Sequence, residues 1–351
     1  MKILNYFAAF TLLFPFFVVF TASADEDFTK KYRKEFKSDS HTEVDIFNKF
    51  GDVNITDWDK NMVAIEVVVS VEADDKEEAN EYFERIAITL EKSGNTVKGK
   101  TEILRGFSNV SFSIDYKINM PKNLRLKLMN KYGNVFINEL SNKIDVAVKY
   151  GSLKANKLSY GNETTKSEIS LAYCKGSAIE KCSFLKLNLA YSKLEIEESN
   201  ALTLETKYSK FYLEKANSVL TSSKYDTYRI GEIDKFKTFE AKYSEYEIRQ
   251  LSSTIEAEIK YSEIEVDKIP AGFDVIDIRM AYGKINLNID TEASYMLDAY
   301  TKYGKIDYPS GNKLNRQKEN AILKVWGNVG SESNPKSKVK LRGSYGKIYL
   351  D

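Results

Sequence analysis

The sequence has little of what most enzyme mechanisms require. His41 is the only histidine in 351 residues, and the chain has two cysteines, five prolines and 17 glycines. A lone histidine nearly excludes catalytic sites that pair histidine with serine or cysteine, and zinc sites built on histidine. So few glycines do not form the glycine-rich repeats that bind calcium, and no phosphate-binding loop or nucleophile-elbow motif occurs.

The chain also lacks an excess of charge of either sign. It has 52 basic and 51 acidic residues, and leaving out residues 1–24 removes one lysine and no acid. A nucleic-acid-binding protein is expected to gather a basic excess on one face, so we expect no nucleic-acid partner. Carboxylates are numerous, which leaves a paired-acid glycosidase or a lyase open on composition alone.

One long apolar stretch lies at the start of the chain. Residues 1–24 contain Lys2, the run LLFPFFVVF and the small-x-small sequence Ala22-Ser23-Ala24. This order is typical of a cleaved signal peptide, so we predict an exported mature chain, in the periplasm or on the cell surface. No later stretch is long and apolar enough to cross a bilayer, and we expect no transmembrane segment after cleavage.

The two cysteines, Cys174 and Cys182, lie eight residues apart. An oxidising compartment permits a disulfide between them, but a fully extended strand would hold their Cα atoms roughly 26 Å apart. A bridge therefore requires a chain reversal near Gly176-Ser177. The alternative is a pair of small buried side chains.

The most informative pattern is a repeat centred on tyrosine. The stretch AKYSEYEI at residues 241–248 returns as IKYSEIEV at residues 259–266, and related stretches recur along most of the chain. Self-similarity with a period of about 20 residues is typical of a solenoid, in which each unit buries its apolar side against its neighbours. The repeated residues are Tyr132, Tyr150, Tyr173, Tyr191, Tyr208, Tyr225, Tyr243, Tyr261, Tyr282, Tyr303 and Tyr345.

The apolar positions within a unit predict what each unit looks like. Ala257, Ile259 and Tyr261 occupy alternate positions, whereas Ile264 and Val266 follow in the opposite phase. A strand keeps one face inward only while its alternation is unbroken, so the phase change requires a corner. Each unit is then strand, corner, strand and turn. We predict an all-β fold, a parallel β-solenoid of the β-helix-like kind with about a dozen short coils.

The same alternation predicts the role of the tyrosines. Their phase places the rings inside the core at the corner, where stacked rings form a structural ladder. The alternative is an outward strip of aromatic rings that contacts a ligand. The residue after each tyrosine is glycine, serine, aspartate or cysteine. Glycine adopts unusual backbone angles freely, and serine and aspartate hydrogen-bond to their own backbone in a bend.

The region before the repeats has a different character. Residues 25–40 are charged and aperiodic, which predicts a flexible lead. Residues 41–120 read as an N-terminal β region that caps the solenoid, with one amphipathic helix near residues 75–86. The repeats then fill residues 121–351.

The order of these segments carries a resemblance. NKFGDVNI, a strand pair, a helix, DYKINMPKNLRLKLMNKYGNVFINEL and then repeated KYG and KYS units follow one another. The chain thereby resembles a bacterial family of β-strand-repeat domains of unknown function, named putative adhesins and related to the putative auto-transporter adhesin head domain. The resemblance implies an exported β-solenoid with a role in adhesion. Serine at four of the corners departs from the family's glycine.

One surface pattern is a candidate binding site. The residue before the tyrosine is lysine in four consecutive units, at Lys207, Lys224, Lys242 and Lys260. In a parallel stack these ammonium groups would form a column one strand spacing apart, which predicts a stripe that binds an acidic glycan or protein. The alternative is ordinary solvated charge, balanced by neighbouring glutamates.

These observations favour a binding protein. No catalytic motif is present, and units of 17 or 18 residues leave little chain to build the walls of a cleft. We expect a non-enzymatic adhesion or binding module of the cell envelope, with no catalytic residue, cofactor or metal, whose partner is a glycan or an envelope protein. A structural or assembly scaffold of the envelope is the alternative, and a polysaccharide-degrading enzyme is a third reading.

Overall fold

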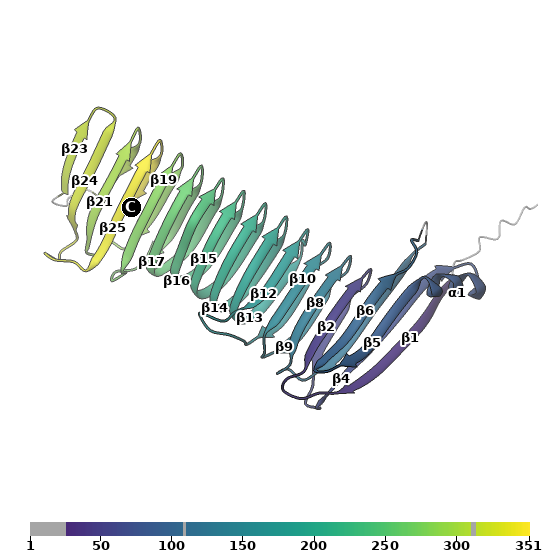
Figure 1. The fold of residues 1–351 in the computed structure, drawn as a ribbon. Coiled ribbons are helices and arrows are strands. Elements are labelled where there is room, and N and C mark those ends of the chain that lie inside the picture. Colours follow the sequence, from purple (N-terminus) through teal and green to yellow (C-terminus); the bar gives the residue numbers. More distant parts are fainter. Residues whose placement is uncertain (1–25, 108–109, 310–313) are drawn as a thin grey trace, which may run out of the picture.

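The structure is a computed structural model that describes residues 26–107, 110–309 and 314–351. The predicted signal peptide, residues 1–24, lies outside the described residues. Within them the fold is all-β, a long mixed sheet of many strands with one short helix (Figure 1). In the described part of the chain, no helix has the length and apolarity required to cross a membrane.

The first eight elements form the N-terminal end of the molecule. They are β1 (Glu26–Lys37), β2 (Glu43–Lys49), β3 (Val53–Asp57), β4 (Met62–Ala73), α1 (Lys76–Glu84), β5 (Ile86–Ser93), β6 (Thr96–Ile103) and β7 (Phe112–Met120).

The middle of the chain consists of short strands followed by five long ones. They are β8 (Arg125–Lys131), β9 (Val135–Leu140), β10 (Ile144–Lys149), β11 (Leu153–Leu158), β12 (Ser167–Ala172), β13 (Ser177–Ala190), β14 (Lys193–Lys207), β15 (Lys210–Lys224), β16 (Thr227–Lys242) and β17 (Glu245–Lys260).

The C-terminal part returns to short strands. They are β18 (Glu263–Ile269), β19 (Val275–Ala281), β20 (Lys284–Ile289), β21 (Tyr295–Lys302), β22 (Lys305–Asp307), β23 (Leu314–Glu319), β24 (Ile322–Val329), β25 (Ser337–Ser344) and β26 (Lys347–Leu350).

The strands are arranged in two rows. We call the strands that lead into each tyrosine the entry row and the strands that leave it the exit row. The entry row runs β5, β6, β2, β8, β10, β12, the later halves of β13 to β17, β19, β25, β21, β24 and β23. The exit row runs β1, β4, β7, β3, β9, β11, the earlier halves of β13 to β17, β18, β20, β26 and β22.

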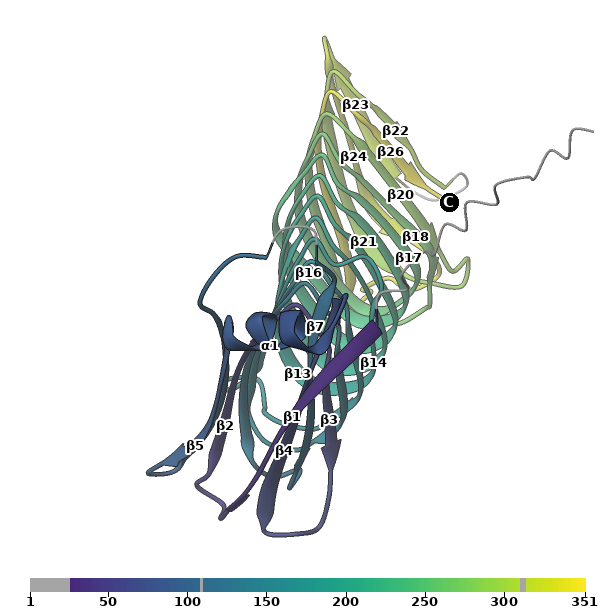
Figure 2. The ribbon, with the colours of Figure 1, turned by 90° about the vertical axis from the view of Figure 1, so that its right-hand side faces the viewer.

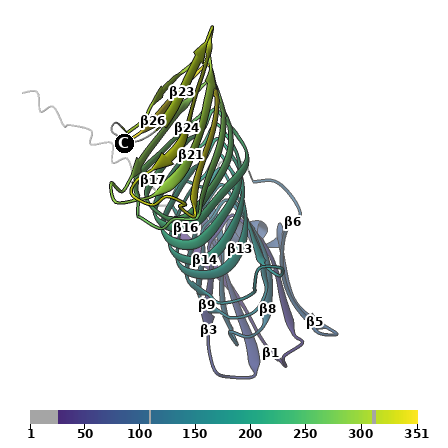
Figure 3. The same cartoon turned by 90° about the vertical axis from the view of Figure 1, so that its left-hand side faces the viewer.

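The hydrophobic core lies between the two rows. Figures 2 and 3 view the stack from its two ends, and successive units superpose into a narrow wedge with a row on each side. In most strands alternate residues are buried, as in β10, where Ile144, Val146 and Val148 point inward. The largest fully buried side chains include the rings of Tyr228 and Tyr246. The period-two alternation therefore predicts the buried face of the strands correctly.

Three of the four edges at the ends of the stack are antiparallel strands, and the fourth is the three-residue parallel strand β22. At the N-terminal end, β5 pairs with β6 and β1 pairs with β4, each antiparallel. At the other end, β24 pairs antiparallel with β21 and β23 with β24. The side chains of β23, in the sequence LNRQKE, are almost all exposed. Charged, short edge strands of this kind hinder pairing with another sheet.

The segment predicted to be a flexible lead is instead an ordered strand. Residues 26–37 form β1, which pairs with β4 along its whole length. Phe36 is buried, and Phe28 and Tyr32 pack against the core. The sequence of β1 does not look like a strand, because most of its residues are charged and only every fourth side chain, Phe28, Tyr32 and Phe36, packs inward. Such charge is common on the exposed face of an edge strand.

The helix α1 lies where the sequence predicts one. It begins after Asp75, whose carboxylate accepts a hydrogen bond from the backbone N–H of Glu78 at 2.9 Å, as an N-cap residue does. Ala79 and Phe83 are buried on its inner face. The helix packs against β4 at the end of the stack.

The C-terminal units are not stacked in the order of the sequence. The entry strand β25 lies between β19 and β21, and the exit strand β26 lies between β20 and β22. The unit of Tyr345 is therefore inserted between the units of Tyr282 and Tyr303. The interval between Tyr303 and Tyr345 is twice the usual spacing, and its midpoint at Trp326-Gly327 forms no corner, because both residues lie within β24 opposite Asp298 and Leu297.

Candidate functional site

A column of aromatic rings runs along the corner between the two rows. Twelve rings stack in succession, with centroids 4.8 to 5.0 Å apart and planes within 18° of parallel. In spatial order they are Phe50, Tyr132, Tyr150, Tyr173, Tyr191, Tyr208, Tyr225, Tyr243, Tyr261, Tyr282, Tyr345 and Tyr303. We call this set the tyrosine column.

The rings of the column are on the surface, so the prediction that they point into the core is wrong. The eleven tyrosines are 41% to 54% exposed. The reason is the backbone at the tyrosine itself, where φ lies between +51° and +60° in every unit. Alternation predicts a side-chain direction only for extended backbone, and a left-handed residue turns its side chain away from that face.

The left-handed backbone makes tyrosine a costly residue at this position. A residue with a Cβ in this conformation is disfavoured by about 1 to 2 kcal/mol, whereas glycine adopts it freely. Each tyrosine recovers stability through its neighbours, because a stacked aromatic pair contributes about 0.5 to 1.5 kcal/mol beyond the area it buries. Since neighbouring rings cover both faces, a ligand can reach only the edges and hydroxyl groups of the column.

The residue after the tyrosine makes two kinds of corner. At glycine corners the units approach so closely that a Cβ added to Gly151 would lie 1.9 Å from the carbonyl oxygen of Gly133. At serine corners the hydroxyl fills the gap instead. The backbone N–H of Ser192 donates to Ser209 Oγ at 3.2 Å, and Ser209 Oγ donates to the carbonyl of Lys207 at 2.9 Å. This bonding of serine to its own backbone is the behaviour that the sequence predicts for the bend.

One corner residue carries a buried charge. Asp226 is 4% exposed, and its carboxylate accepts hydrogen bonds from the backbone N–H groups of Ser209 and Lys224, both at 2.7 Å, and from Thr206 Oγ1 at 2.7 Å. Burial nevertheless raises the pKa of Asp226 above its ordinary value of 3.8, because desolvation outweighs these hydrogen bonds.

Replacing Asp226 with serine is expected to change how stability depends on pH. A raised pKa means that the folded state takes up the proton more readily than the unfolded state. The wild type should therefore gain stability relative to Asp226→Ser as the pH falls from neutral toward 3.8, and lose that gain as the pH rises again. Urea unfolding at a series of pH values measures the difference. Asp267→Ser, at an exposed position, is the control, and parallel curves for wild type and Asp226→Ser would contradict the expectation.

The predicted lysine stripe exists as a row beside the tyrosine column. Strand pairing places Lys207, Lys224, Lys242 and Lys260 in register on the entry row. Three of the ammonium groups lie against tyrosine rings, with Nζ 5.5 to 5.8 Å from the ring centroids of Tyr208, Tyr225 and Tyr261. Lys242 is different, because it forms an ion pair with Glu240. The structure thus brings the four residues together without showing what they bind.

The lysine row extends beyond these four residues, and it has two gaps. Lys49, Lys131 and Lys149 continue it in one direction and Lys302 ends it in the other. Ala172 and Ala190 occupy the first gap. Ala281 and Ser344 occupy the second. A surface hollow lies at each gap, of about 470 Å³ at the first and about 500 Å³ at the second.

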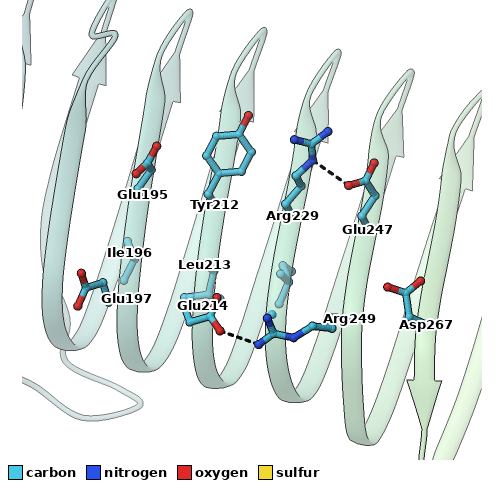
Figure 4. A pocket seen from close by; sticks show the side chains of 12 residues that line it. Glu195, Ile196, Glu197, Tyr212, Leu213, Glu214, Arg229, Glu247, Arg249 and Asp267 are labelled. Carbon is cyan, nitrogen blue, oxygen red and sulfur yellow. Dashed lines mark hydrogen bonds and ion pairs between the residues drawn. The ribbon is translucent and has the colours of Figure 1, made fainter.

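A third hollow, of about 410 Å³, lies on the outer face of the exit row (Figure 4). Arg249 pairs with Glu214 at 2.6 Å, and Arg229 pairs with Glu247 at 2.8 Å. The side chains of Glu214 and Glu247 are 64% and 43% exposed. A general acid at neutral pH is usually a carboxyl group kept protonated by burial, whereas these groups are solvated and paired with arginine. The hollow is a charged surface and not an arrangement suited to acid–base chemistry.

The two cysteines are separate and buried, and no disulfide joins them. Cys174 lies at a corner and Cys182 within β13, so much of an extended strand separates them and the reversal that a bridge requires is absent. Burial raises the pKa of both thiols, that of Cys182 to about 11. Among the described residues no group of histidine, cysteine and acidic side chains is placed to hold a metal ion.

Comparisons with known proteins give only distant structural likeness. No family model matches the chain, and no characterised protein matches it in sequence. A putative adhesin from Parabacteroides distasonis ATCC 8503 has 12% identity and a TM-score of 0.29, with 92% of this chain and 97% of that chain covered. A putative adhesin from Bacteroides fragilis NCTC 9343 has 10% identity and the same coverage and TM-score. A putative lipid binding protein from Parabacteroides distasonis has 14% identity and a TM-score of 0.25, with 92% and 96% covered.

Proposed function

We propose that the chain is an exported, non-enzymatic β-solenoid that acts as an adhesion or binding module at the cell envelope. The parallel, in-register pairing of successive units in two rows supports the solenoid. The signal-peptide pattern of residues 1–24 supports export, to the periplasm or the cell surface. We expect a glycan or an envelope protein as the partner, and no cofactor.

The tyrosine column is the observation that carries this proposal. Monomeric soluble proteins rarely expose a large continuous patch of apolar side chains, and such patches usually mark interaction surfaces. Here eleven half-exposed tyrosines follow one another along the stack. The lysine row beside them adds positive charge, so the combined surface is suited to a long partner that carries negative charge.

The edges at the ends of the stack favour binding over a scaffold role. A scaffold that grows from copies of one chain would use its open edges for pairing. The last strands here are antiparallel, as in β1, β5 and β23, or only three residues long, as in β22. Surface labelling of intact cells tests the location. Labelled protein is expected for an adhesin, whereas protein protected until the outer envelope is opened would favour the scaffold.

Changing Lys207, Lys224, Lys242 and Lys260 together to glutamine is expected to abolish retention of the mature chain on an acidic glycan array. Retention of the wild type should fall steeply between low and physiological salt, because exposed charges are screened over about 8 to 10 Å. Thermal stability should change little, since each exposed charge contributes at most about 1 kcal/mol.

The matched control changes four lysines on the exit side, Lys175, Lys193, Lys210 and Lys215, to glutamine. This variant has the same net charge as the first and should be retained like the wild type. Equal loss in both variants would show that net charge and not the row is responsible. No wild-type retention at low salt on any acidic glycan would remove the row as a binding surface.

A further inference from the structure

The regular surface of the entry row is interrupted at one place in two ways. The lysine row is replaced by Ala172 and Ala190, which opens the hollow of about 470 Å³. The unit between Tyr150 and Tyr173 is also longer than its neighbours, and residues 159–166 form a loop between β11 and β12. Both interruptions involve β12, since the loop precedes its first residue and Ala172 is its last. Repeat proteins place insertions on one face, often the face that binds.

Most of the floor of the hollow is lined by small side chains, with the larger Met129 beside Ala147 at one edge. Ala147, Ser170, Ala172, Asn188 and Ala190 lie on the outward faces of β10, β12 and β13. We call this floor the alanine trough. The Asn188 amide Nδ2 donates to Glu168 Oε1 at 2.8 Å and lies 3.3 Å from Ser170 Oγ, which holds it in the floor. The trough therefore offers apolar surface with a polar group fixed at its centre.

Three lysines border the trough at the end nearest the tyrosine column. Lys131 and Lys149 stand on one side of the gap and Lys207 on the other. No ion pair joins any of the three to another residue in the described ranges, although Lys149 and Lys207 lie against tyrosine rings at 5.0 and 5.5 Å. Glu205 is the one acid among the described lining residues. The described lining therefore carries three lysines and one acid, a net positive charge, and none of the three lysines is held in an ion pair.

The trough continues into a second hollow under the loop. That hollow, of about 440 Å³, is lined by Tyr160 and Thr165 of the loop and by Glu168, Lys186 and Thr203 of the strands. The three strand residues are two positions before Ser170, Asn188 and Glu205, on the same outward face. Lys166 Nζ donates to Thr203 Oγ1 at 2.6 Å and fixes the loop to β14. From Ala172 to Glu168 the surface spans about 13 Å along the strand.

The shape and chemistry of this surface select among ligands. An acyl chain gains most from a pocket that encloses it, whereas a sugar ring has one apolar face and needs cover on that side only. A protein partner would bury about 800 Å² on each side, more than a trough a few strands wide supplies. Lysines suit carboxylate or sulfate groups, and Asn188, Ser170 and Thr203 suit ring hydroxyls.

We propose that the alanine trough, with the hollow under the loop at residues 159–166, is a binding site for an acidic oligosaccharide. The inference rests on the proposed binding function and names its ligand and its place. The sugar rings lie on the alanine floor, their acidic groups meet Lys131, Lys149 and Lys207, and the loop holds the far end of the ligand.

The experiment places lysine, the residue at the equivalent position of the neighbouring units, at Ala172 and Ala190 in the first gap of the lysine row. The variant Ala172→Lys/Ala190→Lys has lysine at the two positions where the neighbouring units already have lysine on equivalent backbone. It should therefore fold like the wild type, and circular dichroism measures whether it does. The matched control, Ala281→Lys/Ser344→Lys, adds the same charge at the second gap of the row. Isothermal titration measures binding of a short oligogalacturonate, its uncharged counterpart of equal length, and dodecanoate.

The wild type is expected to bind the oligogalacturonate and to bind the uncharged oligosaccharide more weakly. Filling the trough should weaken binding of the oligogalacturonate at least about tenfold in spite of the added positive charge, and the control variant should bind like the wild type. Equal or tighter binding after filling would overturn the proposal, because attraction by charge alone predicts that result.

Three outcomes separate this proposal from the proposed function. If all variants bind the oligogalacturonate equally, the trough is not the site, while the binding function stands on another surface. If dodecanoate binds and the oligosaccharide does not, the ligand class is wrong. If the wild type binds no oligosaccharide, the trough proposal fails, and surface labelling of cells still tests adhesion independently.

Discussion

Replacing Gly151 with alanine is expected to lower the free energy of unfolding by about 3 kcal/mol or more. The added Cβ would lie 1.9 Å from the carbonyl oxygen of Gly133 and 2.7 Å from its carbonyl carbon. These are backbone atoms of the neighbouring unit, so no side-chain rotation relieves the overlap. The two units must separate at the corner, which weakens the hydrogen bonds and the ring stacking of Tyr132 on Tyr150. The midpoint of urea unfolding measures the effect.

Gly106→Ala is the matched control for this substitution. A Cβ at Gly106 meets no atom within 4 Å, and its stability should stay within about 0.5 kcal/mol of the wild type. Ser209→Ala tests the other kind of corner, because it removes the acceptor of the Ser192 N–H and should cost about 1 to 3 kcal/mol. If Gly151→Ala unfolds at the wild-type midpoint, the units are further apart than described.

The second large effect is expected for Tyr246→Ala, with a loss of about 3 to 5 kcal/mol. Tyr246 is fully buried, stacks on Tyr228 at 4.8 Å and contacts Phe236 edge-on at 5.3 Å. Its hydroxyl is also hydrogen-bonded to Ser223 Oγ. Removing the ring leaves a cavity that the two rows of strands, held by their own ladders, cannot fill. Thermal and urea unfolding of the purified variant measure the loss.

Tyr243→Ala, three residues earlier in the chain, provides the comparison. The ring of Tyr243 is 47% exposed and stacks on Tyr225 and Tyr261 at 4.8 and 5.0 Å. Loss of two stacked pairs should cost about 1 to 3 kcal/mol, and alanine keeps the unfavourable left-handed backbone. The effect should therefore be smaller than for Tyr246→Ala. A larger effect at Tyr243 would show that the column and not the core holds the units together.

The repeat made much of the fold predictable from the sequence. Alternation in stretches such as Ala257, Ile259 and Ile264, Val266 predicts which residues are buried, and the structure buries all four. The corner after each tyrosine was predictable as well, because the apolar phase changes there and the next residue is glycine, serine, aspartate or cysteine. The helix was predictable from the spacing of Ala79 and Phe83, which both face the core.

The direction of the tyrosine rings was not predictable in the same way. The alternation rule treats Tyr243 as an extended residue, and it then falls on the inward face with Ala241. A left-handed backbone at tyrosine leaves no sequence signal of its own, because glycine and asparagine are the usual residues for it. The stacking that compensates it exists only when neighbouring units are assembled.

Part of the candidate site could be predicted from the sequence. The lysine row follows from the residue before each tyrosine, and the gap at Ala172 and Ala190 could have been read at the same positions. What the sequence lacks is the link between that gap and the loop at residues 159–166, since the two come together only when β12, β13 and β14 lie side by side. The second gap could not be predicted from the order of the repeats, because Ala281 and Ser344 become neighbours only through the insertion of β25.

That insertion separates the order of folding from the order of synthesis. β21 and β22 leave the ribosome before β25 and β26, yet each later strand forms hydrogen bonds on both of its sides, to an earlier unit and to the terminal one. A chain that stacked its units one by one as they emerged would place Tyr303 directly on Tyr282 and leave no room for Tyr345. We therefore expect β21 and β22 to join the stack only after β25 and β26 have been synthesised. Pairing of these four strands is expected to be the slowest step in assembling the stack, because the other units pair with units next to them in the sequence.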